Sequence, residues 1–249
     1  MGERTSYPPG TFSWAELATS DAEGAKSFYS TVFAWDYEDN PIGDGQVYSM
    51  ARRDGKVVAA LFGSDQPPHW NCYVTVDSVE ETTARAGADG AAVLAEPFDV
   101  MDVGRMSVIA DPTGAALCLW EPRSQIGAAL VNTPGAMTWN DLLTPDADAA
   151  ARFYEALFGW TTEEIPDAGG YRVIGNGERA NGGIMQSADA PPNWMPYFGH
   201  EDVDRLVADV AGLGGRLLNG PMRMPQGSVA VLGDPQGAVF AVWTGEYDD

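Results

Sequence analysis

The sequence WAELATSD at residues 14–21 returns as WNDLLTPD at residues 139–146, a shift of 125 positions (139 − 14). The aromatic residues that follow repeat at the same shift without a gap. They are Phe28, Tyr29, Phe33 and Trp35 in the first copy and Phe153, Tyr154, Phe158 and Trp160 in the second. Self-similarity at a fixed period indicates a repeated structural unit, so the chain is predicted to contain two copies of one fold.

Two later sequence motifs extend the repeat, with a slightly smaller offset between the copies. PPHWNCY at 67–73 matches PPNWMPY at 191–197 at a shift of 124 (191 − 67), and DPTGA at 111–115 matches DPQGA at 234–238 at a shift of 123 (234 − 111). Single-residue losses between conserved words are what duplication followed by shortening of loops would leave. The repeat therefore spans nearly the whole chain.

The join between the copies lies in a stretch punctuated by glycine and proline, which break regular structure. We therefore predict one domain over residues 1–124 and a second over 133–249, connected by a linker at 125–132. A chain of 249 residues is long enough for two domains with a hydrophobic core each.

Within each copy, short segments alternate between apolar and polar residues, as in 47–51 and 72–76, and this period of two predicts strands. Amphipathic segments follow Asp21 and Ser78, and Asp21 is suited to cap a helix. The predicted order is strand, helix and three strands, twice per domain. The fold class is α+β.

Composition excludes several classes of function. The 36 Asp and Glu residues outnumber the 14 Lys and Arg, and the formal net charge of −22 would repel nucleic acids and anionic membrane surfaces. No stretch has the length of a membrane span or the pattern of a secretion signal, so a cytoplasmic protein is expected. The two cysteines, Cys72 and Cys118, are expected to be reduced, although one disulfide between them stays possible.

This set of sequence motifs resembles that of the vicinal oxygen chelate superfamily, which contains glyoxalases, bleomycin-resistance proteins and extradiol dioxygenases. The similarity lies in the capping Asp, the helix with Phe-Tyr, the word Phe158-Gly159-Trp160 and the Asp-Pro-x-Gly turn near the end of each domain. It is greatest to two-domain actinobacterial members, some labelled hydroxylases and some antigens. The resemblance implies tandem glyoxalase-like domains, each a curved mixed sheet of two βαβββ units with helices on its convex side.

In metal-using members of that superfamily, the ligands come from fixed strand positions on the concave side. Here these positions hold Trp14, Asn71 and Cys118 in the first domain and Trp139, Met195 and Ala241 in the second, and the segments around 57–62 and 182–186 supply no His or carboxylate. A stable divalent site needs three or four suitable N, O or S ligands. The resemblance therefore predicts a concave pocket without a metal or other cofactor.

Side chains alternate along a strand, so the residues two positions from each mapped ligand share its face. These are Glu16 and Tyr73 in the first copy and Asp141 and Tyr197 in the second. Each domain is thus predicted to place a Trp, a carboxylate and a Tyr in its hollow, which suits an aromatic ligand. The carboxylates are candidate general bases, but a structural salt bridge or hydrogen bond is an equal alternative. Trp and Tyr on strands are more often part of the core or of an interdomain contact than of a ligand site, and this alternative applies to the aromatic residues.

Three functions fit these features. The first is a metal-independent protein that binds a small aromatic or polyketide-like metabolite, for sequestration or tailoring. The second is a cofactor-free tailoring enzyme (lyase, hydrolase or accessory hydroxylase component) that uses Glu16 or Asp141, and the third is a scaffold or interaction protein. In each case a monomer is expected, with the two domains forming an internal pseudo-dimer, because fusion supplies the partner domain at high local concentration.

Overall fold

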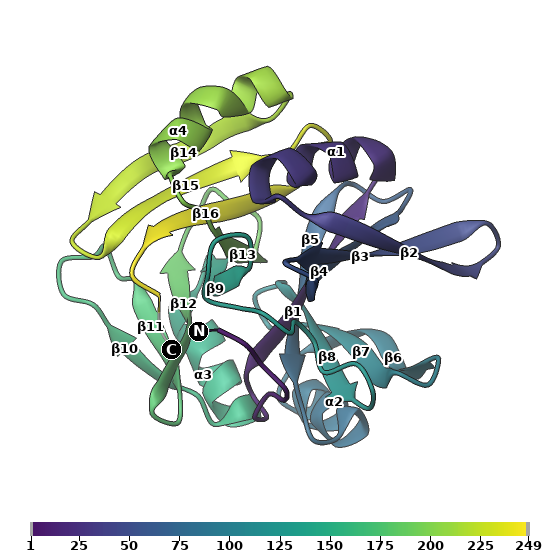
Figure 1. Ribbon diagram of the computed structural model, residues 1–249. Helices are drawn as coiled ribbons and strands as arrows, with labels where there is room; N and C mark the ends of the chain where they lie inside the picture. Colours follow the sequence, from purple (N-terminus) through teal and green to yellow (C-terminus); the bar gives the residue numbers. More distant parts are fainter. Residues whose placement is uncertain (1, 248–249) are drawn as a thin grey trace.

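The computed structural model describes residues 2–247, which form two eight-stranded sheets with two α-helices each (Figure 1). The first sheet consists of β1 (Phe12–Thr19), β2 (Asp36–Gly43), β3 (Gln46–Arg53), β4 (Lys56–Gly63), β5 (His69–Thr75), β6 (Ala92–Val100), β7 (Gly104–Ala110) and β8 (Ala116–Pro122). The second consists of β9 (Met137–Thr144), β10 (Thr161–Glu164), β11 (Arg172–Asn176), β12 (Arg179–Gln186), β13 (Asn193–Gly199), β14 (Arg216–Met224), β15 (Gly227–Gly233) and β16 (Val239–Gly245). The helices are α1 (Ala22–Phe33), α2 (Val79–Ala88), α3 (Ala147–Phe158) and α4 (Val203–Asp209).

The strand order is the same in both sheets. It runs β2-β3-β4-β1-β5-β8-β7-β6 in the first and β10-β11-β12-β9-β13-β16-β15-β14 in the second. β1 pairs in parallel with β4, β5 pairs in parallel with β8, and the two halves meet at the antiparallel pair β1 and β5. Each sheet is thus two βαβββ units side by side, which confirms the predicted α+β tandem fold.

All four helices begin at a side chain that caps the first turn. Asp21 accepts a hydrogen bond from the backbone N–H of Gly24, and Ser78, Asp146 and Asp202 do the same for the later helices. Such a cap satisfies one of the free N–H groups of the first turn. The capping role predicted for Asp21 is confirmed. Among residues 2–247, no helix combines the length and the apolar character that crossing a bilayer requires.

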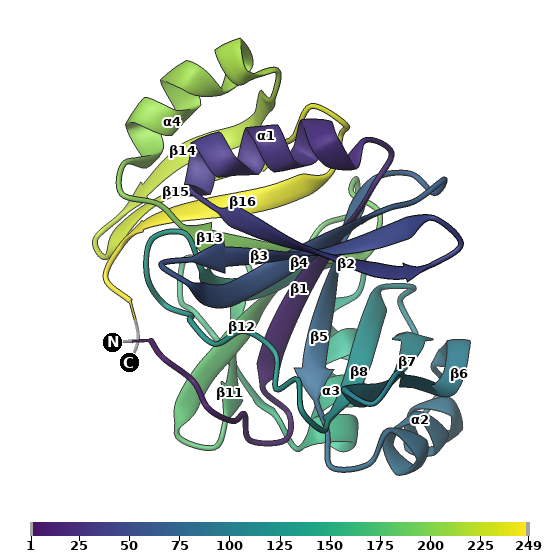
Figure 2. The same cartoon turned by 45° about the vertical axis from the view of Figure 1, so that its right-hand side comes forward.

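The domains pack back to back through aromatic side chains of the repeated words. α1 of the first domain lies beside β16 of the second in both views (Figures 1 and 2), where Phe28 contacts Phe240. The indole N–H of Trp35 donates to the carbonyl of Gly135, and its repeat equivalent Trp160 donates to that of Gly10. The interface is therefore two-fold symmetric in its contacts.

The chain between the sheets packs against both domains. The N–H of Ala128 donates to Ser13 O and that of Ala129 to Val57 O, both at 2.8 Å, in the first domain. Further along, the N–H of Gly135 donates to Gly199 O in the second domain at 2.9 Å. This connection therefore adds backbone hydrogen bonds across the domain junction.

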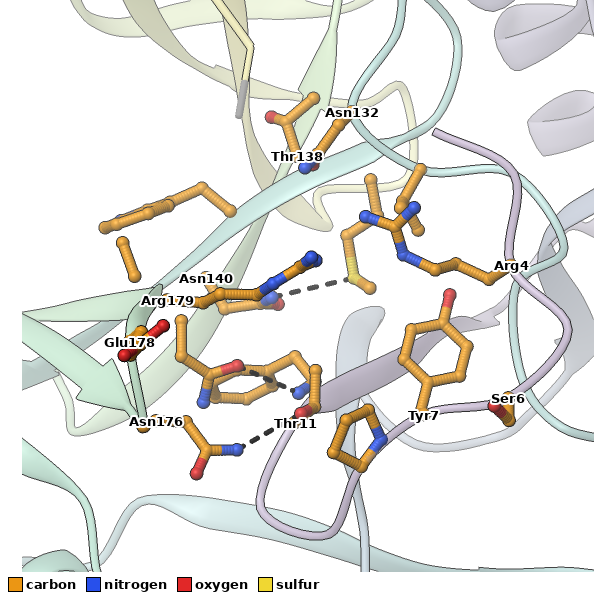
Figure 3. A pocket seen from close by; sticks show the side chains of 18 residues that line it. Arg4, Ser6, Tyr7, Thr11, Asn132, Thr138, Asn140, Asn176, Glu178 and Arg179 are labelled. Atoms are coloured by element: carbon orange, nitrogen blue, oxygen red, sulfur yellow. Dashed lines mark hydrogen bonds between the residues drawn. The ribbon is translucent and has the colours of Figure 1, made fainter. Parts of the chain in front are cut away.

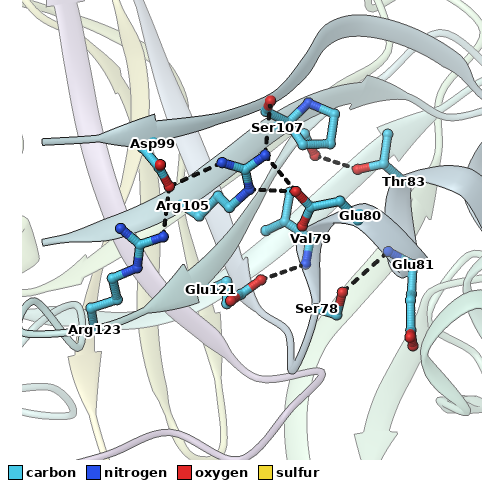
Figure 4. Close-up of polar contacts among 11 residues, drawn as sticks. Ser78, Val79, Glu80, Glu81, Thr83, Asp99, Arg105, Ser107, Glu121 and Arg123 are labelled. Carbon is cyan, nitrogen blue, oxygen red and sulfur yellow. Dashed lines mark hydrogen bonds and ion pairs between the residues drawn. The ribbon is translucent and has the colours of Figure 1, made fainter. Parts of the chain in front are cut away.

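Charged side chains fix α2 on the convex side of the outer strands β6 to β8 (Figure 4). Arg105 on β7 pairs with Glu80 at the start of α2 and with Asp99 on β6, which also accepts a hydrogen bond from Arg123 at 2.7 Å. A carboxylate oxygen of Glu121 on β8 accepts from the first N–H of α2 at 2.9 Å. Exposed ion pairs contribute little stability singly, but this set holds the helix away from the concave face.

Candidate functional site

A cavity of about 470 Å³ opens on the concave face of the first sheet. We call this face with its cavity the first cup. Apolar and aromatic side chains, three of them methionines, form most of its wall and a few polar groups converge in it, the usual make-up of a small-molecule pocket. The lining includes Trp14, Glu16, Glu38, Asn40, Tyr48, Met50, Arg52, Tyr73, Met101, Met106, Trp120 and Gln125.

Strand register brings the central residues of the first cup together. On β1 and β5, Trp14 lies opposite Tyr73 and Glu16 lies opposite Asn71. Because alternate residues of a strand share a face, these four side chains lie on the concave side. Cys118 of β8 pairs with Tyr73 from the other side, and so the sequence-predicted residues of the first domain are neighbours.

Glu16 is the centre of a hydrogen-bonded cluster. Its carboxylate accepts from the hydroxyl of Tyr73 at 2.5 Å, from the hydroxyl of Tyr48 at 2.8 Å, and from the amide of Asn71 at a long 3.4 Å. The indole N–H of Trp14 donates to the Tyr48 hydroxyl at 3.2 Å. This side-chain network fixes the carboxylate at the cavity wall, where only 9% of the residue is exposed.

Burial sets the protonation behaviour of this cluster. Desolvation raises the pKa of Glu16 above its ordinary value, while the hydrogen bonds from Tyr73 and Tyr48 oppose the rise. Burial, and then the charge of Glu16, raise the pKa values of both tyrosines, so they stay neutral donors. The site can therefore bind or release a proton at Glu16 while its two phenols keep the carboxylate in place.

The equivalent face of the second sheet, which we call the second cup, repeats this hydrogen-bonded cluster with a shorter carboxylate. Asp141 accepts from the indole N–H of Trp139 at 2.9 Å, from the hydroxyl of Tyr171 at 2.8 Å, and from the hydroxyl of Tyr197. The residue is 2% exposed, and desolvation raises the pKa of its carboxyl while these donors lower it. Both oxygens of Asp141 are thus engaged by the protein itself.

A compact apolar group lies beside Asp141. Met195, Tyr197, Val229 and Ala241 form a separate buried cluster, against which Trp139 packs. The mapped positions of the second domain therefore hold close-packed apolar side chains, and the nearby carboxylate of Asp141 already has a donor at each oxygen. The two cups differ in what they leave open to a ligand.

Neither cup fits a divalent metal ion. Among the residues that the structure describes, no three His, Cys, Asp or Glu side chains are grouped closely enough to hold a metal. In the first cup the candidate donors are the carboxylates of Glu16 and Glu38 and the thiol of Cys118. Glu38 is paired with Arg52, and burial followed by the charge of Glu16 raises the pKa of the Cys118 thiol. A cysteine ligand must be a thiolate, so this environment disfavours the form that a metal would need.

Several lining residues were not among the sequence candidates. Tyr48 and its counterpart Tyr171 each donate to the carboxylate of their cup, and Trp120 contributes to the wall of the first cavity. Met101 and Met106 also line that cavity. Cys72 and Cys118 are both free and buried, as expected for a reduced pair.

Comparison with known proteins agrees with the fold. The model of the glyoxalase-like domain family matches residues 14–120 and again 137–243. The chain is 43% identical over 254 residues to the "Putative glyoxylase CFP32" of Mycobacterium tuberculosis, with 97% of each chain covered. It is 32% identical to the anthracycline biosynthesis protein DnrV of Streptomyces peucetius, covering 96% of this chain and 94% of that protein.

Solved structures show the same architecture at low sequence identity. The Mn(II)-bound glyoxalase of Novosphingobium aromaticivorans superimposes with a TM-score of 0.69 at 16% identity, over 100% of this chain and 85% of that one. The 2,3-dioxygenase LapB of Pseudomonas sp. KL28 gives 0.68 at 15% identity, over 96% and 94%. At such identities the likeness concerns the fold alone, that of the vicinal oxygen chelate superfamily. With its two matched repeats and its full-length relatives, the chain belongs to the glyoxalase-like domain family.

Proposed function

We propose that the first cup binds a small aromatic, polyketide-like metabolite without a metal ion. The observation that carries this proposal is the cavity of about 470 Å³ whose wall combines Trp14, Tyr73 and Trp120 with the buried carboxyl of Glu16. Indole and phenol rings offer apolar contact area to a planar ligand, and the carboxyl offers one directional polar contact. The relative named for anthracycline biosynthesis supports this class of ligand, because anthracyclines are planar aromatic polyketides.

The methionines of the wall support the same class. Met50, Met101 and Met106 line the side of the cavity formed by β3 and by the hairpin of β6 and β7. Met is flexible and its thioether makes favourable contacts with aromatic rings, so these side chains can adjust to a flat ligand. We place the working site in the first domain because Asp141 in the second is already held by three donors of the protein.

The binding test uses the purified protein in buffer with EDTA and 1,8-dihydroxyanthraquinone as the planar probe. We expect saturable quenching of tryptophan fluorescence, and loss of it in Met106→Trp, which fills the cavity. Leu94→Trp is the matched control, since Leu94 lies on β6, is 59% exposed and does not line the cavity. Absence of saturable binding, or equal binding by both variants, would overturn the proposal.

A second candidate function is cofactor-free tailoring, with Glu16 as general acid or base. The observation in its favour is the raised pKa of a carboxyl that two tyrosine hydroxyls hold at the cavity wall. A carboxyl with a raised pKa can exchange a proton with a bound ligand. Glu16→Gln separates the candidates. If Glu16→Gln loses turnover of a substrate but keeps its affinity for it, the result supports catalysis by Glu16. If the variant turns the substrate over at the unchanged rate, Glu16 is excluded as the catalytic group.

A further inference from the structure

Met101 is the most exposed large apolar side chain in the part of the chain that the structure describes, at 67%. It lies in the turn between β6 and β7, and it lines the cavity of the first cup together with Val100, Val103 and Met106 of the same hairpin. From the opposite edge of the sheet, Ile42 of β2 also lines the cavity and is 43% exposed. An exposed thioether therefore lies at the mouth of the cavity.

The backbone of Met101 has a φ of +45°, in the left-handed region. Most other non-glycine residues with a positive φ in the described chain are Asp or Asn, such as Asp44 and Asp54, and short polar side chains of this kind tolerate the region well. Methionine gives such a turn no advantage of its own, and backbone outliers concentrate at functional sites. Contact with a ligand explains Met101 at this position better than stability of the hairpin does.

The other methionines of the described chain do not combine this exposure with this position. Met50 and Met106 line the same cavity but are partly buried. Met222 and Met224 of β14 are 40% and 46% exposed, but they do not line the cavity. Susceptibility of a thioether to oxidants in solution increases with its exposure, so Met101 is the sulfur of the first cup that an oxidant reaches most easily.

A second cavity, at the domain junction, holds a methionine in the opposite environment (Figure 3). This cavity, of about 590 Å³, lies between the N-terminal segment and β9, and Met137 lines it. Met137 is only 3% exposed, and its sulfur accepts a hydrogen bond from the amide of Asn140 at 3.6 Å. A buried thioether is protected from oxidants in solution, so Met137 serves as an internal comparison for Met101.

We propose that the thioether of Met101 is a peroxide-sensitive contact of the first cup, and that its oxidation weakens ligand binding there. This inference rests on the function proposed for that cup. A sulfur lone pair of Met101 attacks one oxygen of hydrogen peroxide, so that an S–O bond forms and the O–O bond breaks. The departing hydroxide takes up the proton of the attacked oxygen and becomes water, and the two electrons that sulfur loses reduce the peroxide. The sulfoxide is polar and loses the favourable contact of a thioether with an aromatic ring.

The test measures binding of 1,8-dihydroxyanthraquinone before and after brief treatment of the folded chain with hydrogen peroxide, while peptide mass spectrometry follows each methionine. We expect Met101 to be converted first and Met137 to stay unoxidised. The Kd of the probe should rise about two- to tenfold as Met101 is converted, the loss of one contact between sulfur and a ring. Reduction by methionine sulfoxide reductases should restore the original affinity.

Two variants assign the effect to one sulfur. Met101→Leu removes the oxidisable atom, so its affinity should be the same before and after peroxide. Met224→Leu is the matched control, because Met224 is exposed in the equivalent hairpin of the second domain and does not line the cavity. It should bind like the natural chain and lose the same affinity on oxidation.

The outcomes separate this inference from the function on which it rests. Unchanged affinity once Met101 is a sulfoxide, or an equal loss of affinity in Met101→Leu after peroxide, would overturn this inference alone. Oxidation of Met137 ahead of Met101 would do the same. No saturable binding by the untreated chain would overturn the function proposed for the first cup and this inference with it.

Discussion

The hydroxyl of Tyr29 in the first domain donates a hydrogen bond to the carboxylate of Asp234 in the second, at 3.0 Å. The repeat makes the reciprocal contact, because the hydroxyl of Tyr154 donates to Asp111 at the same distance. Each Asp also accepts backbone N–H groups of its own turn, which explains why the Asp-Pro-x-Gly word occurs in both copies. The Tyr of one copy therefore binds the turn of the other.

We expect Tyr29→Phe to lower the free energy of unfolding by about 1–3 kcal/mol, because it removes a donor from a buried carboxylate. It also leaves the indole N–H of Trp70 without the Tyr29 oxygen that it contacts at 3.2 Å. Tyr154→Phe should cost a similar amount, since Trp194 makes the equivalent contact at 2.9 Å. Urea unfolding followed by circular dichroism measures both.

The matched control is Tyr37→Phe. Tyr37 also has a buried hydroxyl, but this oxygen has no hydrogen-bond partner in the described part of the chain. Its removal should be neutral or stabilising, as expected for a buried polar group without a partner. A destabilisation equal to that of Tyr29→Phe would show that loss of any buried phenol is costly and that the contact between domains has no special part.

Glu16→Gln should change stability in a way that depends on pH. Burial raises the pKa of Glu16 in the folded state, whereas the unfolded value is near 4.3. The favourable contribution of the protonated carboxyl is complete below that value and is lost as pH rises through the folded pKa. The variant should therefore gain stability relative to the natural chain as pH rises above about 4.3, measured by urea unfolding at each pH.

Asp39→Asn is the control, because the pH dependence of its stability difference should have the opposite sign. The hydrogen bond from Lys26, followed by that from Ser49, holds the pKa of Asp39 below its ordinary value, so its contribution is present above the unfolded pKa and is lost as pH falls. This carboxylate is largely exposed, and a small effect is expected. A stability difference for Glu16→Gln that stays constant across pH would contradict a raised pKa.

The fold could be predicted from the sequence because each repeated motif forms a local or interdomain contact that requires particular residue types. Asp21 caps α1, Trp35 donates to Gly135 O across the junction, and the turn Asp accepts the partner tyrosine. Such residues resist substitution during divergence, and the repeat stays recognisable. The face shared by Trp14 and Glu16 follows from strand alternation alone.

The tyrosines that complete each cup could not be found in this way. Tyr48 lies on β3, an eight-residue strand, whereas Tyr171 directly precedes β11, which has five residues. Loop editing between the copies has changed the shift there to 123 (171 − 48), and only strand pairing in space shows that both reach their carboxylate.

The donor set of the first cup leads to an expectation about metals. The mapped ligand positions hold Trp14, Asn71 and Cys118, so the protein should purify without a stoichiometric divalent ion. EDTA should leave both the melting temperature and the binding of the planar probe unchanged. Elemental analysis after mild purification checks this, and one equivalent of manganese, iron, nickel or zinc bound in either cup would contradict it.

The domain interface leads to an expectation about assembly. Its aromatic side chains, among them Phe28 and Phe240, are already covered by the other domain of the same chain. A second copy is not needed to bury them, and we expect a monomer. Light scattering should give a mass near 26.5 kDa across a wide concentration range. A dimer that persists on dilution would contradict this expectation.

Trp14→Ala and Trp139→Ala test whether the indoles serve a ligand or the core. Trp14 is 6% exposed yet lines the first cavity, and its N–H donates to Tyr48. Loss of a stacked ring would remove about 1 kcal/mol of binding, whereas a cavity left in the core would cost about 3–5 kcal/mol of stability. We expect Trp14→Ala to weaken binding of the planar probe, and Trp139→Ala, which removes a donor to Asp141, to lower the melting temperature with affinity retained. Retained affinity in folded Trp14→Ala protein, together with a large drop in its melting temperature, would show that this indole is packing and that the ligand site lies elsewhere.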